Sequence, residues 1–242
     1  MKNKKVKGIK MSLKHKLVKF TNYGDDFLKG NLFLNPLEYY RGVEDVINGN
    51  ANERNVAIND YLEGSVASVN VNDLSKFGLE FGDEIKNNLV GNVHLLSEDL
   101  KFVKLLCLYV FLYDKERRVI LPPDKKISTF NAKEAIIIHN VDEFETRIKT
   151  ALDKRETSIV GVKQGFVDYY ENDEHTKLLG PFNKTTDFKW QNEFRFAFYE
   201  EPVSLEPTIL KIGDISDIAI KVDVEYFLDN TIDFFEEYIQ IF

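Results

Sequence analysis

The sequence predicts an α+β protein with a mixed or antiparallel sheet at its core and irregularly placed helices. Strand-like segments outnumber helical ones, and the helical segments do not alternate regularly with the strands. A regular alternation would instead indicate a doubly wound sheet or a barrel of parallel strands. Hydrophobic residues make up 43% of the 242 residues, and 19 residues are Phe. That apolar content supplies a full core and argues against global disorder.

The N-terminal part predicts two short strands and two helices. Residues 17–20 and 32–34 are short apolar runs of strand length, and residues 23–28 between them fit a short helix. A second helix is expected over residues 37–47. Pro36 would occupy its first position, since a helix leaves the first N–H groups unpaired and proline has none.

The middle of the chain predicts several strands and one clear helix. Residues 49–60 are polar and loop-like. The helix covers residues 141–152, where Val141, Phe144, Ile148 and Leu152 recur at helical spacing. A strand with imperfect alternation is followed by three strands that we expect to be buried: residues 65–71, then 93–96, 103–113 and 135–138.

The C-terminal part returns to strands. Residues 194–199 give the clearest pattern, because Phe194, Phe196 and Phe198 alternate with other residues, as expected for a half-buried strand. Further strands and two closing helices follow the same reasoning. The strands are residues 159–170, 209–212 and 218–222, and the helices are residues 224–228 and 232–241.

We expect residues 1–16 to be a basic, flexible arm and residues 17–242 to form one domain. The arm holds seven Lys and no acidic residue, and removing those charges from the net −8 leaves the remainder at −15. We expect nucleic-acid binding only through this arm, because the acidic body repels phosphate. Translation from Met11 would shorten the arm.

The chain predicts a soluble, cytoplasmic protein without a disulfide. No apolar run approaches the roughly 20 residues that span a bilayer, and no apolar segment follows the basic N-terminus as in a signal peptide. Cys107 is the single cysteine and lies in an apolar run, which favours a buried structural thiol.

The sequence carries no motif for a phosphate loop, a dinucleotide fold, a zinc protease or a serine hydrolase. Its four histidines are far apart: His15, His94, His139 and His175. We therefore expect no metal site.

One strand carries a row of polar side chains opposite its phenylalanines. Gln191, Glu193 and Arg195 are two residues apart, so in a strand they share one face. This face can bind a polar ligand, or it can be a solvated surface on which Glu193 and Arg195 pair with each other.

Two segments resemble a family of bacterial and phage proteins to which no activity is assigned. The first is Gly-x-Leu-x-Leu-Asn-x-Leu-x-Tyr-Tyr-Arg at residues 30–41, followed later by Glu63-Gly64. The second is Gln-x-Glu-Phe-Arg at residues 191–195, followed by Ile-Gly-Asp-Ile-x-Asp at residues 212–217. The resemblance covers roughly residues 17–222.

More distantly, the strand–helix–strand opening and the late Gln-x-Glu resemble the ADP-ribosyltransferase superfamily, which binds NAD in a split sheet. This resemblance implies that Glu193 contacts the nicotinamide ribose and that Gln191 orients the acceptor. The first strand of that superfamily usually offers Arg or His to NAD, whereas here only Lys19 or Thr21 is available.

The chemistry adds further candidate residues to this NAD site. Cleavage of the N-glycosidic bond develops positive charge on the ribose, which a fixed carboxylate stabilises. Tyr39, Tyr40 or Tyr61 can clamp the nicotinamide, and Arg41 can donate to a phosphate, as can Arg195 on the polar face.

Two functions follow as alternatives. The first is an NAD-dependent transferase or glycohydrolase of phage–host conflict. The second is a non-enzymatic protein that inhibits or senses a host or phage partner, with the acidic body facing a basic surface. In the second case the helix over residues 231–242 docks the partner or a second copy, or packs onto its own sheet.

Overall fold

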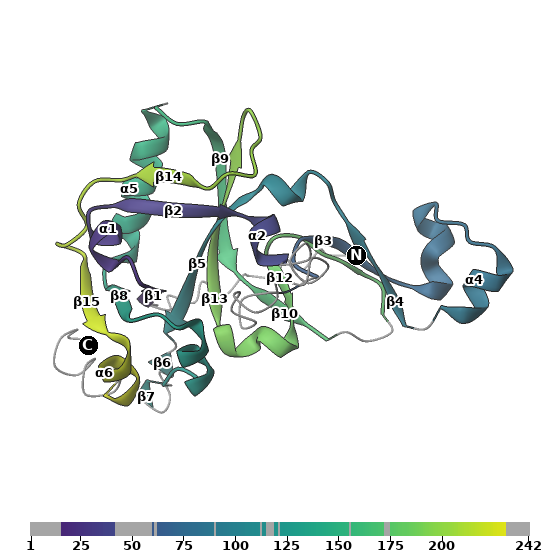
Figure 1. Cartoon of the computed structure of the whole chain (residues 1–242), viewed down its shortest axis with the longest axis horizontal. Helices are drawn as coiled ribbons and strands as arrows, with labels where there is room; N and C mark the ends of the chain where they lie inside the picture. Colours follow the sequence, from purple (N-terminus) through teal and green to yellow (C-terminus); the bar gives the residue numbers. More distant parts are fainter. Residues whose placement is uncertain are drawn as a thin grey trace, which may run out of the picture.

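The computed structural model describes residues 16–41, 60, 62–89, 91–111, 113–114, 119–120, 122–154, 156–171 and 175–230 (Figure 1). Several sequence predictions lie outside these ranges: nearly all of the Lys-rich arm, the second half of the helix over 37–47, most of the loop over 49–60, Tyr61 and the helix over 231–242. The single-domain prediction stays a prediction.

The α+β fold class is confirmed, and the main sheet is antiparallel in all its strand pairs. Its strand order is β14-β2-β5-β1-β8-β15, with β13 pairing to β5 and β9. The eight strands are β1 (Lys16–Thr21), β2 (Asn31–Pro36), β5 (Lys104–Phe111), β8 (Glu134–Ile138), β9 (Ile159–Phe166), β13 (Glu193–Glu200), β14 (Thr208–Lys211) and β15 (Ala219–Asp223).

Helix α5 (Val141–Asp153) packs on one face of this sheet and forms the main core. Its buried Phe144 and Ile148 belong to the same apolar cluster as Phe194, Phe196 and Phe198 of β13. The strand predicted from the three alternating phenylalanines is thus confirmed, with all three on one buried face. The expectation that the strand is only half-buried is wrong, because the side chains of its other face are buried as well.

The opposite face carries a second apolar cluster. It joins Val18 and Ile137 of the sheet to Phe227 of helix α6 (Val224–Asp229) and Ile127 of the 3₁₀ helix η3 (Lys125–Phe130). Because α5 and α6 lie on different faces, the sheet is covered on both sides where β1 and β8 pair.

A lobe projects from this body in Figure 1. Its three-stranded sheet has the order β11-β3-β4, and a small core of Ala67, Val69 and Leu74 lies within it. The lobe consists of β3 (Ser65–Asn70), η1 (Val71–Phe77), α4 (Asp83–Asn88), β4 (Asn92–Leu96) and β11 (Lys177–Leu178). The expectation of a buried strand at residues 93–96 is wrong in its burial, because β4 belongs to this lobe and is partly exposed.

Three local predictions are corrected. Pro36 is the last residue of β2 and lies opposite Lys104, so the helix α2 (Leu37–Arg41) begins after it. The segment over 159–170 forms two strands, β9 and β10 (Asp168–Tyr170), and β10 pairs in parallel with β12 (Asn183–Thr185). Gln191 ends the 3₁₀ helix η4 (Thr186–Gln191) and is not part of the strand.

The remaining elements are short connections: α1 (Gly24–Leu28), η2 (Leu100–Phe102), β6 (Tyr113–Asp114) and β7 (Val119–Ile120). In the part of the chain that the structure describes, no helix has the length and apolar character needed to cross a membrane.

Candidate functional site: a cavity where the sheet splits

The main sheet splits along one edge of β5. On one side, β13 pairs with β5 from Lys104 to Tyr109. On the other side, β2 pairs only at residues 104–105 and β1 only at residues 109–111, so residues 106–108 face neither strand. Lys19 bridges part of this gap, because its amine donates to the backbone oxygen of Cys107 at 3.2 Å.

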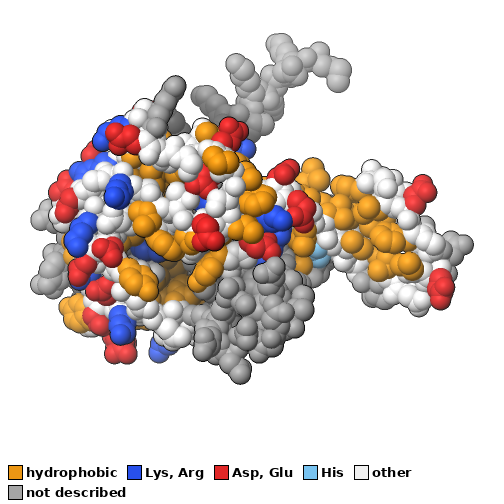
Figure 2. All heavy atoms as spheres, turned by 45° about the horizontal axis from the view of Figure 1, so that its top comes forward, with side chains coloured by type: hydrophobic (Ala, Val, Ile, Leu, Met, Phe, Trp, Pro, Cys, Tyr) orange, Lys and Arg blue, Asp and Glu red, His pale blue; other side chains and the backbone are white. Residues whose placement is uncertain are grey.

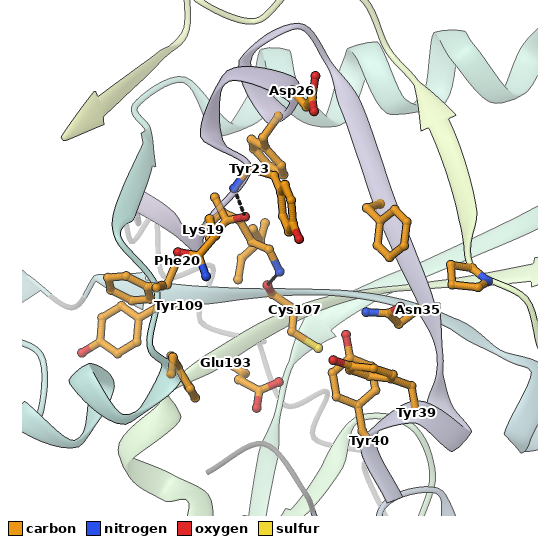
Figure 3. A pocket seen from close by; sticks show the side chains of 18 of the residues that line it. Lys19, Phe20, Tyr23, Asp26, Asn35, Tyr39, Tyr40, Cys107, Tyr109 and Glu193 are labelled. Carbon is orange, nitrogen blue, oxygen red and sulfur yellow. Dashed lines mark hydrogen bonds between the residues drawn. The ribbon is translucent and has the colours of Figure 1, made fainter. Parts of the chain in front are cut away.

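A cavity of about 1020 Å³ occupies the split (Figure 3). Eight aromatic side chains contribute to its walls: Phe20, Tyr23, Phe27, Phe33, Tyr39, Tyr40, Tyr109 and Phe130. Four amides and five charged groups also line it: Asn22, Asn31, Asn35, Gln191, Lys19, Asp26, Lys184, Glu193 and Lys211. A large concave space with aromatic walls and a few polar groups is typical of a small-molecule site.

Glu193 lies on the cavity lining at the first position of β13. Its backbone is held on both sides, because its N–H donates to the hydroxyl of Tyr169 at 2.9 Å and it lies opposite Tyr109 of β5. The preceding Asn192 has a left-handed φ of 39° and donates its side-chain N–H to the Val110 carbonyl at 2.6 Å. These contacts fix where the strand starts and therefore where the carboxylate lies.

Glu193 belongs to a group of four buried charged side chains, which we call the buried charge cluster: Glu63, Lys184, Glu193 and Arg195. They are 0%, 3%, 8% and 1% exposed, respectively. The solvated-surface alternative for this strand face is therefore excluded.

Both carboxylate oxygens of Glu193 have a cationic partner. Oε1 accepts from the Lys184 amine at 2.8 Å, and Oε2 accepts from Arg195 Nε at 2.7 Å. Arg195 also donates from its two terminal nitrogens to the two oxygens of Glu63, at 2.5 and 3.0 Å. The Lys184 amine lies 3.5 Å from Glu63 as well, so Glu63 contacts both cations that hold Glu193.

These contacts set the protonation states. Burial alone would raise the pKa of Glu193, but the charges of Arg195 and Lys184 outweigh it and hold that pKa well below its usual range. Burial likewise opposes the charged form of Lys184, yet Glu193 and Glu63 outweigh it and raise its pKa. Glu193, Lys184 and Arg195 are therefore all charged at neutral pH.

The Glu63-Gly64 pair is explained by the turn that carries it. Gly64 has a φ of 72°, and a Cβ atom there would lie 2.3 Å from the Leu37 side chain, so only glycine fits. Arg41 fixes the turn by donating to the backbone oxygens of Glu63 at 2.8 Å and Gly64 at 3.4 Å. Its remaining nitrogen donates to Glu38 at 2.8 Å.

The structure brings six of the eight predicted site residues to the cavity lining: Lys19, Thr21, Tyr39, Tyr40, Gln191 and Glu193. The guanidinium groups of Arg41 and Arg195 instead donate to protein acceptors and are 6% and 1% exposed. Although Gln191 is not in the strand, its side-chain oxygen accepts from the same Lys184 amine at 2.5 Å.

Two tyrosines face the same space as Glu193. Figure 3 shows the carboxylate of Glu193 and the rings of Tyr39 and Tyr40 around one part of the cavity, beside Cys107. The two rings meet edge to face at 5.2 Å, and the side chain of Tyr40 also hydrogen-bonds to Asn35. Burial raises the pKa of Tyr40 well above its usual value, so its hydroxyl stays protonated.

Cys107 is partly exposed on the cavity lining, so the expectation of a buried structural thiol is wrong, but the thiol is a poor nucleophile. Burial and the neighbouring Glu193 raise the pKa of its thiol to about 12. Among the described residues, no three His, Cys, Asp or Glu side chains are grouped as metal ligands.

Sequence reasoning missed most of the cavity. It gave no role in the site to Lys184, Asn22, Asn31 or Lys211, and it quoted Glu63 in a motif without placing it beside Glu193. No local pattern marks these residues, since they converge only where the sheet splits.

Comparisons with protein-family models, curated proteins and solved structures found no match to this chain. The resemblance to the ADP-ribosyltransferase superfamily therefore stays a prediction.

Proposed function

We propose that the cavity binds NAD and that the protein cleaves the bond between nicotinamide and ribose, as a transferase or a glycohydrolase. One observation carries this proposal: an ionised carboxylate, that of Glu193, lies on the lining of an aromatic-walled cavity at the split of the sheet. Such a carboxylate stabilises a positive charge that develops on a bound sugar.

The reaction breaks the bond between C1′ of the ribose and N1 of the nicotinamide. The bonding electron pair moves to N1, which neutralises the positive charge of the pyridinium ring and leaves positive charge on the ribose. Water or an acceptor nucleophile then forms the new bond to C1′ and loses a proton to solvent water. Glu193 acts as a fixed anion beside the ribose, since its low pKa makes it a weak base.

Glu193 can still accept hydrogen bonds from a ligand. An ionised carboxylate offers about four acceptor positions, and the contacts to Lys184 and Arg195 use one on each oxygen. A ribose hydroxyl can donate to one of the others. The cationic partners weaken the attraction of Glu193 for a positive ribose, but they also hold the carboxylate in one position.

The remaining lining suits the other parts of NAD. Rings such as Tyr39 and Tyr40 can stack on the nicotinamide or the adenine, and the amides of Asn31 and Asn35 can bond to carboxamide or ring atoms. The amines of Lys19 and Lys211 supply positive charge for the pyrophosphate.

Calorimetry of NAD binding, followed by an assay for nicotinamide release, tests the proposal. We expect Glu193→Gln to lose turnover. That change leaves the buried cations Lys184 and Arg195 with less compensating negative charge, which also lowers stability. Tyr39→Ala therefore serves as a second variant. Tyr39 is 37% exposed, so the loss of its ring should weaken NAD binding with little effect on folding.

The matched control is Glu200→Gln on the same strand. Glu200 is 7% exposed and pairs with Lys104 at 3.4 Å, and neither residue lines the cavity. This variant should bind NAD like the unaltered protein. No binding by the unaltered protein at millimolar NAD would reject the proposal.

A second candidate function is binding to a partner protein through the projecting lobe. Among the described residues of the lobe, five large apolar side chains are exposed: Phe77, Phe81, Ile85, Leu96 and Leu178. Figure 2 shows hydrophobic side chains gathered on this lobe, and such patches mark interaction sites more often than isolated apolar residues do. Loss of partner binding in a Phe81→Ser, Ile85→Ser variant that keeps NAD binding would support this function.

A further inference from the structure

The buried charge cluster is weak evidence of a contribution to stability. A buried ion pair pays a desolvation cost that often equals its Coulombic gain, and apolar residues of similar volume frequently serve stability as well. Here the cluster joins residues far apart in sequence, because Glu63 follows α2 whereas Arg195 lies in β13. Its arrangement at the cavity therefore calls for another explanation.

Arg195 links Glu63 to Glu193, so that the position of Glu63 determines the orientation of the Glu193 carboxylate. A guanidinium is planar, so the two parallel contacts to Glu63 fix the plane of the group and thus the direction of its Nε–H. That Nε–H donates to Oε2 of Glu193 at 2.7 Å. The backbone oxygen of Pro181 accepts from the same guanidinium at 2.7 Å and limits its rotation further.

Lys184 provides a second link. Its amine contacts Oε1 of Glu193 at 2.8 Å and lies 3.5 Å from Oε2 of Glu63. Glu63 is 0% exposed and is not on the cavity lining, so it reaches a ligand only through these two cations.

We propose that Glu63 is a positioning residue, which acts through Arg195 and Lys184 to fix the direction in which the Glu193 carboxylate faces the cavity. The role of that carboxylate toward a ligand rests on the proposed function. The orientation itself does not, since it is a property of the protein without ligand.

Glu63 also balances the charge beside the cavity. The cluster holds two carboxylates and two cations, so it is neutral with Glu63 and carries one positive charge without it. A positive cluster would oppose both the pyridinium ring of NAD and the cationic ribose that forms on cleavage. Because Glu193 lies beside the ribose in the proposed complex, cleavage moves the positive charge from the ring onto the sugar, closer to the cluster. The loss of Glu63 should therefore lower kcat more than it raises KM for NAD.

The test compares Glu63→Gln, Glu63→Asp and the control Glu200→Gln in the full chain. We expect Glu63→Gln to reduce kcat on the order of 10- to 100-fold, as for other residues that orient a functional side chain, with KM changed less than about threefold. Glu63→Asp keeps the charge but has a shorter reach, so its kcat should lie between that of the unaltered protein and that of Glu63→Gln. Glu200→Gln should lose stability without losing kcat, because it removes a buried partner of Lys104 outside the cavity.

Nuclear magnetic resonance of the carboxyl carbon of Glu193 and of Arg195 Nε–H reports the orientation without any ligand. Both signals should shift in Glu63→Gln and stay in place in Glu200→Gln. Unchanged Glu193 and Arg195 signals in folded Glu63→Gln, or in Glu63→Asp if the glutamine variant does not fold, would overturn the positioning role. If the signals shift but the unaltered protein does not bind NAD, the positioning role stands and the proposed function fails.

Discussion

Asp60 should make the protein less stable as the pH rises from 4 to 8. The residue is 2% exposed, and its side chain accepts a hydrogen bond from the Leu62 N–H at 3.0 Å. Burial, and then the neighbouring Glu63, raise its pKa from 3.8 to about 6. In the unfolded chain the group returns to its ordinary pKa, so folding takes up a proton between these values.

The magnitude follows from the shift in pKa. The folded state stabilises the protonated form of a carboxyl group whose pKa it raises. The loss of folding stability is therefore nearly absent below about pH 3.8, grows as the pH rises, and is complete once the pH has passed through 6. The full shift corresponds to about 3 kcal/mol at pH 8, and about 0.5 kcal/mol of it is already present at pH 4. Asp60→Asn removes the titration but keeps an oxygen for the Leu62 N–H.

The assay is urea unfolding followed by the fluorescence of Trp190, the single tryptophan. The free energy of unfolding of Asp60→Asn, minus that of the unaltered protein, should rise by roughly 2.5 kcal/mol between pH 4 and pH 8. Taking the difference cancels the titration of the other groups.

A control of opposite sign is available at Asp217, whose pKa is lowered by its hydrogen bond to Arg147. Its contribution is present above the unfolded pKa and is lost as the pH falls. The difference for Asp217→Asn should therefore become less favourable with rising pH. A difference for Asp60→Asn that is independent of pH, or that falls with rising pH, would refute the reasoning.

Three further predictions concern the cavity and the core. Cys107 should react with iodoacetamide about 1000-fold more slowly than an ordinary thiol at pH 8, as measured by mass spectrometry, because its pKa of about 12 leaves little thiolate; a normal rate would contradict the raised pKa. Phe196→Ala should lower the free energy of unfolding by about 3–5 kcal/mol in urea, since the ring is fully buried against Phe144, and a loss under about 1 kcal/mol would place the core elsewhere. Gly30→Ala should cost more than about 2 kcal/mol in the same assay, because φ is 78° and the new Cβ would lie 1.8 Å from the Gly213 oxygen; near-normal stability would argue against this turn.

Local patterns determined the elements whose burial is periodic. The alternation of Phe194, Phe196 and Phe198 and the helical spacing of Val141, Phe144 and Ile148 required only the geometry of one strand or one helix. The ends of the helices and strands were harder to predict, because a local pattern does not show which segment an end pairs with. Proline suits both a helix start and a strand end, and only the pairing of Pro36 with β5 decided between them.

The sequence also determined which residue types would meet on the polar side of β13, since Glu193 and Arg195 are two residues apart. It could not determine that this side would be buried. That required β13 to lie between β5 and β9 and required Glu63 to come from 132 positions away. A local pattern carries no information about partners at such a separation.

The cavity was decided by tertiary structure alone. It exists because β1 and β2 both pair with β5 but separate around residues 106–108, so their side chains line a gap instead of a continuous sheet. Strand register and the divergence of two strands depend on packing across the whole core. The sequence therefore determined the elements with a clear apolar period, such as β13 and α5, whereas the tertiary structure decided the remaining elements and brought the polar residues around one site.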